Sequence, residues 1–245
     1  MELLKYDNIK LVVNKEEAFI YYATFIAGEY SFLKIGRDDV VLDAGASIGD
    51  FTVIASRMAK RVIAIEPNPN YLKLLEENLK LNNVNNVEIL PFAIGSTEGK
   101  TKFKLDGVTS SLAEEGVEVE VKPLDSLVSY ADVIKMDIEG AEKYAVKSSV
   151  VRNAREIVME LHGNDNVEFI PRYLRELGFK VKEITFRDLL KNALRNSILH
   201  LPSLIDAELK TNFYATRAFL RKRGASTPSV SQNEYKLIYA FKLHE

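Results

Sequence analysis

The stretch VVLDAGASIGD, residues 40–50, decides the fold of this 245-residue chain. An apolar run ends at Asp43, a loop with two glycines follows, and residues 51–59 have the pattern of a helix. A second apolar run, RVIAIE at residues 61–66, then ends in the acid Glu66. Strand, glycine loop, helix, strand and terminal acid in this spacing predict a nucleotide-binding βαβ unit.

The first residue of the loop pattern distinguishes one class of nucleotide from another. Dinucleotide-binding loops begin with a glycine, which admits a pyrophosphate to the helix N-terminus, whereas this loop begins with Asp43. A carboxylate repels a diphosphate and suits a cation, and S-adenosylmethionine carries an ammonium and a sulfonium. Glu66 is placed to accept hydrogen bonds from ribose hydroxyls. The loop therefore favours S-adenosylmethionine; the alternative is a βα turn that needs glycines only for its backbone.

Further motifs in the same order show that the chain resembles the FkbM family of class I S-adenosylmethionine-dependent methyltransferases. The most specific is the run Lys-x-Asp-x-Glu-Gly-x-Glu at residues 135–142. The resemblance covers roughly residues 38 to 185 and implies methyl transfer, usually to a hydroxyl, without naming a substrate. The matching segments are DAGASIGDF (43–51), EPNP (66–69), EN (77–78), LN (81–82), PFAI (91–94), PLD (123–125), IKMDIEGAE (134–142) and MELH (159–162).

The whole pattern predicts an α/β fold, a Rossmann-like doubly wound seven-stranded sheet of the class I methyltransferase type with a helical insertion before the last strand. Further strands are expected at residues 87–90, 132–137, 157–162 and 180–185, with an antiparallel seventh at 234–243 and a hairpin formed by 100–105 and 117–122. We expect one domain with four parts: an N-terminal helical segment (1–37, with a helix at 15–33 capped by Asn14), a cofactor-binding core (38–185), a basic helical insertion (186–233) and a closing strand (234–245).

The expected cofactor contacts follow from the loop and the strand ends. The adenine is expected to lie beside Ala93, where side-chain identity matters little because backbone amides can bind the base edge. The full set comprises Asp43, Gly45, Ala46, Ser47, Gly49, Glu66, Pro67, Asn68, Ala93 and Asp137.

Ionisable residues lie at the carboxyl ends of the fourth and fifth strands, and these ends meet at one edge of such a sheet. Lys135, Asp137, Glu139, Glu160 and His162 should therefore converge. Three roles are open. His162 would be the general base, oriented by a carboxylate; or Asp137, Glu160 and His162 would hold a divalent cation that acidifies the acceptor hydroxyl; or the acids would bind the methionyl ammonium and cap the next helix.

The residues after the fourth strand also bear on the acceptor atom. Enzymes that methylate exocyclic amines or amide nitrogens carry Asn/Asp-Pro-Pro-Tyr there, whereas this chain has Asp-Ile-Glu-Gly at 137–140. This difference favours oxygen as the acceptor atom.

Composition restricts the class of protein. The net charge is −2, so no overall basic field points to a nucleic-acid partner. Cysteine is absent, which excludes disulfides and cysteine-ligated zinc and fits the cytosol. We expect a cytoplasmic protein, because the sequence has no leader-like segment and no apolar run near 18 residues.

The insertion does not match the family core. Residues 186–224 contain eight basic and three acidic residues, and an apolar stripe of helical period runs through Leu189, Leu190, Ala193, Leu194 and Ile198. We expect a cap over the acceptor site that selects a small-molecule, glycan or lipid acceptor, which the basic charge suggests is anionic. The alternatives are a homodimerisation arm, peripheral contact with anionic lipid headgroups, an RNA-binding surface of an RNA methyltransferase, and a non-catalytic binding module.

Overall fold

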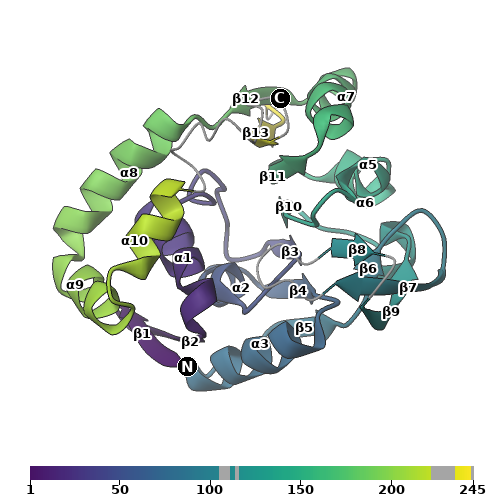
Figure 1. Ribbon diagram of the computed structural model, residues 1–245. Coiled ribbons are helices and arrows are strands. Elements are labelled where there is room, and N and C mark those ends of the chain that lie inside the picture. The colour runs from purple at the N-terminus through teal and green to yellow at the C-terminus, as the bar shows by residue number, and fades with distance from the viewer. Residues whose placement is uncertain (105–110, 114–115, 222–234, 244–245) are drawn as a thin grey trace.

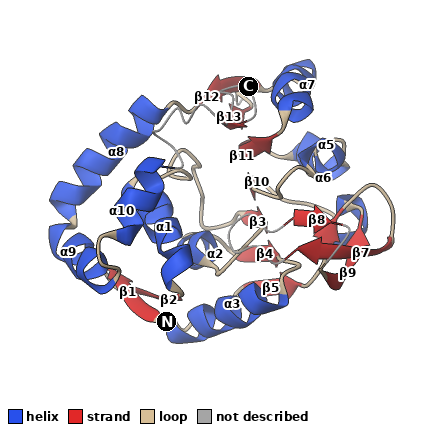
Figure 2. Ribbon diagram, in the orientation of Figure 1, coloured by secondary structure: helices blue, strands red, loops and turns tan. Residues whose placement is uncertain are grey.

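The computed structural model describes the chain except for residues 105–110, 114–115, 222–234 and 244–245. A seven-stranded sheet forms the centre of the described chain, and helices cover both of its faces (Figures 1 and 2). A smaller four-stranded sheet and a two-stranded sheet lie beside it. The layers are those expected of a doubly wound α/β fold.

The central strands are β3 (Val40–Ala44), β4 (Arg61–Ile65), β5 (Val87–Leu90), β10 (Val133–Met136), β11 (Glu156–His162), β12 (Lys180–Glu183) and β13 (Tyr235–Phe241). Their order across the sheet is β12-β13-β11-β10-β3-β4-β5. All neighbours pair in parallel except β13, which is antiparallel to β11 and to β12. The strand order and the single antiparallel strand confirm the predicted class I methyltransferase fold.

Successive residues of the inner strands of the sheet face two separate apolar cores. In β3, Val41 belongs to one core and Leu42 to the other, and both are fully buried. This burial on both faces explains the continuous apolar runs in the sequence. Helices α2 (Asp50–Ser56) and α3 (Pro69–Leu81) cover the first core; α4 (Leu124–Leu127), α5 (Glu142–Ala145), α6 (Ser149–Asn153) and α7 (Asn164–Glu176) cover the second.

The strand order reverses between β3 and β10. From β3 the chain continues to β4 and β5 on one side, whereas β10 and β11 extend the sheet on the other. At such a switch point the connections leave in opposite directions, and a crevice opens at the carboxyl ends of the strands. Asp43 lies opposite Lys135 in the register of this pair. The reversal therefore brings the glycine loop next to the acids that follow β10.

The second sheet contains β6 (Ala93–Ile94), β7 (Gly99–Lys104), β8 (Ser111–Ala113) and β9 (Val117–Lys122) in the order β6-β9-β7-β8. Strands β7 and β9 pair antiparallel, with Lys100 opposite Glu120, which confirms the expected hairpin partners. Thr109 and Ser110, two of the hydroxyl residues between these strands, lie outside the described residues.

The N-terminal segment differs from its prediction. It begins with a hairpin of β1 (Glu2–Tyr6) and β2 (Ile9–Val13) and continues as a 3-10 turn η1 (Lys15–Glu17), α1 (Ala18–Tyr21) and a π-helix η2 (Tyr22–Ile26). The predicted helix at 15–33 is wrong beyond Ile26, because Gly28 adopts a left-handed φ of 62°, which ends helices. Asn14 precedes η1 but makes no capping hydrogen bond with its side chain.

The insertion before the last strand is helical, as predicted. It contains α8 (Phe186–Leu199), α9 (Leu201–Lys210) and α10 (Tyr214–Phe219); Thr185 and Asp188 close a capping box at the start of α8. The remainder of the insertion, from residue 222 to residue 233, lies outside the described residues. Helix α8 contacts η2, α9 contacts β1, and α10 contacts α1. The insertion thus packs on the N-terminal segment (Figure 1).

None of the helices in the described ranges is both long enough and apolar enough to cross a membrane.

Candidate active site

The glycine loop between β3 and α2 lies against the backbone that follows β10. Gly45 has a φ of +79°, and a Cβ atom there would lie 1.7 Å from the carbonyl oxygen of Asp137. Gly49 has a φ of +87°, and its Cβ would lie 2.5 Å from Cδ1 of Leu75. Only glycine combines this backbone conformation with such close approach. The two glycines therefore fix the loop beside the strand ends.

Asp43 is fully buried beneath the loop and has a cationic partner within the protein. Its Oδ1 lies 3.1 Å from Nζ of Lys135, and its Oδ2 accepts a 2.5 Å hydrogen bond from Thr52. Burial lowers the pKa of Lys135, but Asp43 and two further aspartates outweigh it and raise the pKa above its ordinary value. Lys135 also donates to the carbonyl of Gly45. Asp43 thus pairs with a cation of the protein itself, and its direct contact with a cationic ligand stays a prediction.

Glu66 ends β4 and binds two backbone amides. Its Oε2 accepts from the amide of Ser47 and its Oε1 from that of Asn68, both at 2.8 Å. Burial raises the pKa of Glu66 to about 7, and the two amides oppose this rise. Each carboxylate oxygen retains acceptor capacity for a ribose hydroxyl. Glu66 lines the cavity, and its contact with ribose hydroxyls stays a prediction.

One cavity connects the loop, Glu66 and the carboxyl ends of β10 and β11. The N-terminal segment lines it with Phe19, Ile20, Ala23, Thr24, Glu29 and Tyr30. The structure differs from the expectation that the insertion caps the site, because no described residue of α8, α9 or α10 lines the cavity. The remaining lining consists of Gly45, Ser47, Asp50, Ile65, Glu66, Pro67, Tyr71, Phe92, Ala93, Ile94, Lys135, Asp137, Ile138, Glu139, Ala141 and Glu160.

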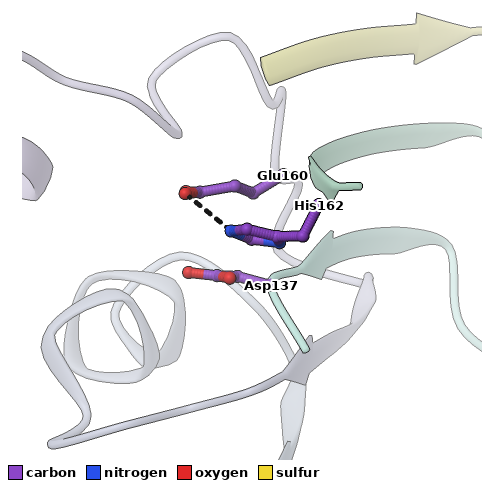
Figure 3. Close-up of side chains that lie close together, drawn as sticks. All are labelled: Asp137, Glu160 and His162. Carbon is purple, nitrogen blue, oxygen red and sulfur yellow. Dashed lines mark ion pairs between the residues drawn. The ribbon is translucent and has the colours of Figure 1, made fainter. Parts of the chain in front are cut away.

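His162, at the end of β11, lies between carboxylates. Figure 3 shows it between Asp137 and Glu160, which point in the same direction. Its Nε2 is 3.3 Å from Glu160 and 3.5 Å from Glu139, and its Nδ1 is 3.0 Å from Glu142. Burial alone would lower the pKa of His162, but hydrogen bonds with Glu142 and Glu160 and nearby negative charge raise it to about 12. The surroundings therefore favour the imidazolium.

Asp137 follows β10 directly and faces the cavity. Within the described parts of the chain, its buried Oδ1 has no hydrogen-bond partner. Burial raises the pKa of Asp137 well above its ordinary value, and the charge of Glu160 raises it further, against the opposing effects of His162 and Lys135. Asp137, Glu139 and Glu160 place three carboxyl groups at this end of the cavity, where their oxygens can accept hydrogen bonds from the ammonium of S-adenosylmethionine.

Comparison with known proteins agrees with this geometry. A family model described as the methyltransferase FkbM domain matches residues 43–181, more than half of the chain. The chain belongs to this family. It is an S-adenosylmethionine-dependent methyltransferase.

Two relatives of this methyltransferase come from Methanocaldococcus jannaschii. An uncharacterized protein is 25% identical over 229 residues, covering 81% of this chain and 87% of the relative. The tRNA (guanine(37)-N(1))-methyltransferase Trm5b is 33% identical over 178 residues, covering 62% of this chain and 52% of that enzyme, or about half its length. Among solved structures, M. jannaschii TYW2 in complex with AdoMet aligns at a TM-score of 0.46 and 14% identity over 98% of this chain and 84% of that chain.

The site residues expected from the sequence of the methyltransferase fall into two groups. Those that line the cavity are Gly45, Ser47, Glu66, Pro67, Ala93, Lys135, Asp137 and Glu160. Those that lie outside its lining are Asp43, Ala46, Gly49, Asn68 and His162. Asn68 instead caps α3, where its side chain accepts a 2.9 Å hydrogen bond from the amide of Asn70.

Sequence reasoning missed the contribution of the N-terminal segment. Thr24, in η2, donates a hydrogen bond to Asp50 at the start of α2, and both residues line the cavity. Burial raises the pKa of Asp50 to about 6, while Lys135 opposes this rise. The ring of Tyr30 also lies at the cavity wall, with its centroid 5.3 Å from Nζ of Lys135. A single sequence carries no signal for a π-helical turn, which brings Thr24 to Asp50.

A direct test of the charge on His162 is nuclear magnetic resonance of the labelled imidazole. Since its folded pKa is raised from 6.5 to about 12, the shifts should remain those of the imidazolium from pH 6 to about pH 9. The stabilisation that protonated His162 provides should be complete below about pH 6.5 and be lost as pH rises towards 12. His162→Gln should therefore lower the unfolding temperature at pH 7. A titration midpoint near pH 6.5 would contradict this description.

Proposed function

We propose that this methyltransferase transfers a methyl group to a hydroxyl of a small acceptor, such as a sugar or glycan, a lipid or a metabolite, that enters the cavity beneath the N-terminal segment. The observation that carries the proposal is Asp137, a carboxyl at the cavity wall whose buried Oδ1 has no hydrogen-bond partner among the described residues and whose pKa is raised. A carboxylate with a raised pKa is a better general base than an ordinary one. The absence of Asn/Asp-Pro-Pro-Tyr at this place also favours an oxygen acceptor.

In this proposal each residue of the site has a separate task. S-adenosylmethionine supplies a methyl group on a sulfonium that is already a good leaving group. Glu66 accepts hydrogen bonds from the ribose hydroxyls, and the loop at Gly45 lets the ligand approach the strand ends. Asp137 accepts the proton of the acceptor hydroxyl at its Oδ1. Apolar residues of the N-terminal segment, including Phe19 and Ile20, exclude water from the reacting atoms.

We assign the general base to Asp137 rather than to His162, which the sequence left as an alternative. Three carboxylates lie within 3.5 Å of the imidazole nitrogens, and an imidazolium has no lone pair with which to accept a proton. His162 instead holds Glu160 and Glu142 in place beside Asp137. It acts as a positioning residue.

A bound cation is the alternative chemistry for the same residues. One ligand atom each from Asp137, Glu160 and His162 lies within 4.8 Å of the others. Two carboxylates and an imidazole suit a divalent transition-metal ion, which would acidify a hydroxyl. Turnover that is unchanged by EDTA supports the carboxylate base. Turnover that EDTA abolishes and Mn²⁺ or Mg²⁺ restores would support the cation.

A second candidate function is methylation of RNA. The relative at 33% identity is named as a tRNA methyltransferase, so the expectation from net charge that nucleic acid is not a partner lacks support from the relatives. The insertion also exposes basic residues, among them Arg187, Lys191 and Arg217. Binding through such residues would weaken steeply with salt. We place RNA second because apolar residues of the N-terminal segment line the same cavity as Asp137, which suits a small acceptor.

The experiment that separates these functions is a transfer assay with methyl-labelled S-adenosylmethionine. Extracts of the source cells are divided into lipid, glycan, RNA and small-molecule fractions, and each is incubated with the protein. The proposal expects label in a lipid, glycan or small-molecule fraction, as a methyl ether. Label in RNA alone would overturn it in favour of the second candidate.

The pH dependence of cofactor affinity tests the role of Glu66. The pKa of Glu66 is raised to about 7, so the carboxylate that accepts hydrogen bonds from the ribose hydroxyls becomes protonated as pH falls below 7. Affinity for S-adenosylmethionine should therefore fall about tenfold between pH 8 and pH 6, measured by titration calorimetry. Glu66→Gln should bind more weakly at pH 8, with a flatter pH profile. The same steep profile in the variant would exclude Glu66 as its source.

A further inference from the structure

The outer faces of α8 and α9 expose a row of large apolar side chains. Leu194, Ile198 and Leu209 are 68%, 71% and 62% exposed, respectively. Each helix carries three such residues at intervals of four, so they lie on one side of the helix. The row consists of Leu190, Leu194 and Ile198 on α8 and Leu201, Ile205 and Leu209 on α9. Single exposed leucines are ordinary, but a row of this kind marks an interaction surface.

The structure divides the apolar stripe that the sequence suggested. Leu189 and Ala193 are buried against the protein, whereas Leu190, Leu194 and Ile198 are exposed. The stripe is therefore wider than the contact between α8 and the rest of the described chain. Helices α8 and α9 lie along the outer edge of the molecule, away from the central sheet (Figures 1 and 2). The exposed half of the stripe points to a partner outside the fold.

Basic side chains run beside the row on α8. Arg187, Lys191 and Arg195 are all exposed and also recur every four residues. On a helix these positions adjoin Leu190, Leu194 and Ile198, because residues three and four apart are neighbours on the surface. The outer face of α8 thus combines an apolar stripe with a positive one.

The acids of the described insertion are engaged within the protein. Asp188 closes the capping box with Thr185. Asp206 pairs with Lys210 at 2.6 Å. Glu208 is buried and accepts hydrogen bonds from Thr216. The charge that this face offers to a partner is therefore positive.

We propose that the outer face of α8 and α9 binds the surface of a bilayer that contains anionic lipids. Apolar side chains that enter the headgroup boundary, flanked by basic residues that meet anionic headgroups, characterise helices lying in that interface. A second copy fits less well, because a two-fold contact would place the positive stripe against itself. An RNA partner would explain the basic side chains but not the exposed leucines and isoleucines, because single-stranded RNA is bound by charge and aromatic stacking.

The test is co-sedimentation of the full chain with vesicles. Vesicles of phosphatidylcholine alone are compared with vesicles that also contain phosphatidylglycerol, at low and high salt. We expect binding to the anionic vesicles at least tenfold stronger than to the neutral ones, and weaker at high salt. Equal binding to both, or binding to neither, would overturn the proposal.

Variants locate the surface. The double variant Leu194→Ser, Ile198→Ser should reduce vesicle binding at least tenfold, whereas Met58→Ser, at an exposed apolar residue outside the insertion, should not. Lys191→Gln with Arg195→Gln should likewise reduce it, in contrast to Lys73→Gln with Lys80→Gln on α3. All of these side chains are exposed, so unfolding temperatures should stay near that of the unchanged protein. Equal loss in the test and control variants would contradict the assignment.

Two further outcomes would also overturn it. One is a dimer in sedimentation that becomes monomeric in Leu194→Ser, Ile198→Ser, together with no vesicle binding. The other is salt-dependent binding of an RNA oligonucleotide through Lys191 and Arg195, together with no binding to vesicles.

Discussion

Asp137→Asn is expected to lower the turnover number about 10²–10⁴-fold, the range that general-base catalysis contributes. The amide cannot accept the proton of the acceptor hydroxyl, although it fills nearly the same space. Affinity for S-adenosylmethionine should fall much less than turnover. Thermal stability should be retained, because burial already disfavours the charged carboxylate in the folded state. The measurement is steady-state kinetics on the acceptor identified by the labelling assay, with calorimetry for the cofactor.

The matched control for this change is Asp38→Asn. Asp38 is exposed and lies before β3, away from the cavity lining. Turnover of the control should stay within about twofold of the unchanged protein, since surface substitutions of this kind have small effects. If Asp137→Asn also kept its turnover within about threefold, the assignment of the general base would be wrong.

Gly45→Ala is expected to destabilise the fold by about 2–5 kcal/mol and to abolish measurable binding of S-adenosylmethionine. The new Cβ would lie 1.7 Å from the backbone oxygen of Asp137, and alanine is strained at a φ of +79°. Neither backbone can move without displacing the end of β3 or β10. Thermal unfolding and calorimetry of the purified variant measure the two effects.

Gly99→Ala provides the comparison. A Cβ at Gly99, the first residue of β7, meets no heavy atom within 4 Å, and its φ is not in the left-handed region. This variant should unfold within about 0.5 kcal/mol of the unchanged protein and bind the cofactor normally. A Gly45→Ala protein that behaved like Gly99→Ala would show that the loop does not need its close approach to Asp137.

Local signals sufficed for the central sheet. Strands β3 and β4 have continuous apolar runs, and Asp43 and Glu66 lie at their ends at the spacing of a nucleotide-binding βαβ unit. Strand β13 alternates in polarity, which allowed its place as the antiparallel seventh strand to be predicted. Residues at the carboxyl ends of adjacent strands, such as Asp137 and His162, could be predicted to lie together from topology alone.

Contacts between distant segments could not be predicted in this way. The pairing of Asp43 with Lys135, the enclosure of His162 by carboxylates and the contact of Thr24 with Asp50 depend on side-chain packing across elements. The position of the insertion is a similar case. Its amphipathic pattern predicted helices, but a pattern does not say which surface they cover, and α10 packs on α1 rather than over the cavity.

The measurement that tests the account most directly is a crystal structure of the protein with S-adenosylhomocysteine. The account predicts that the ribose hydroxyls bind Glu66, that the adenine lies beside Ala93, and that the sulfur faces Asp137 across the space left for the methyl group and the acceptor. A product molecule bound outside this cavity, or one whose sulfur points away from Asp137, would contradict it.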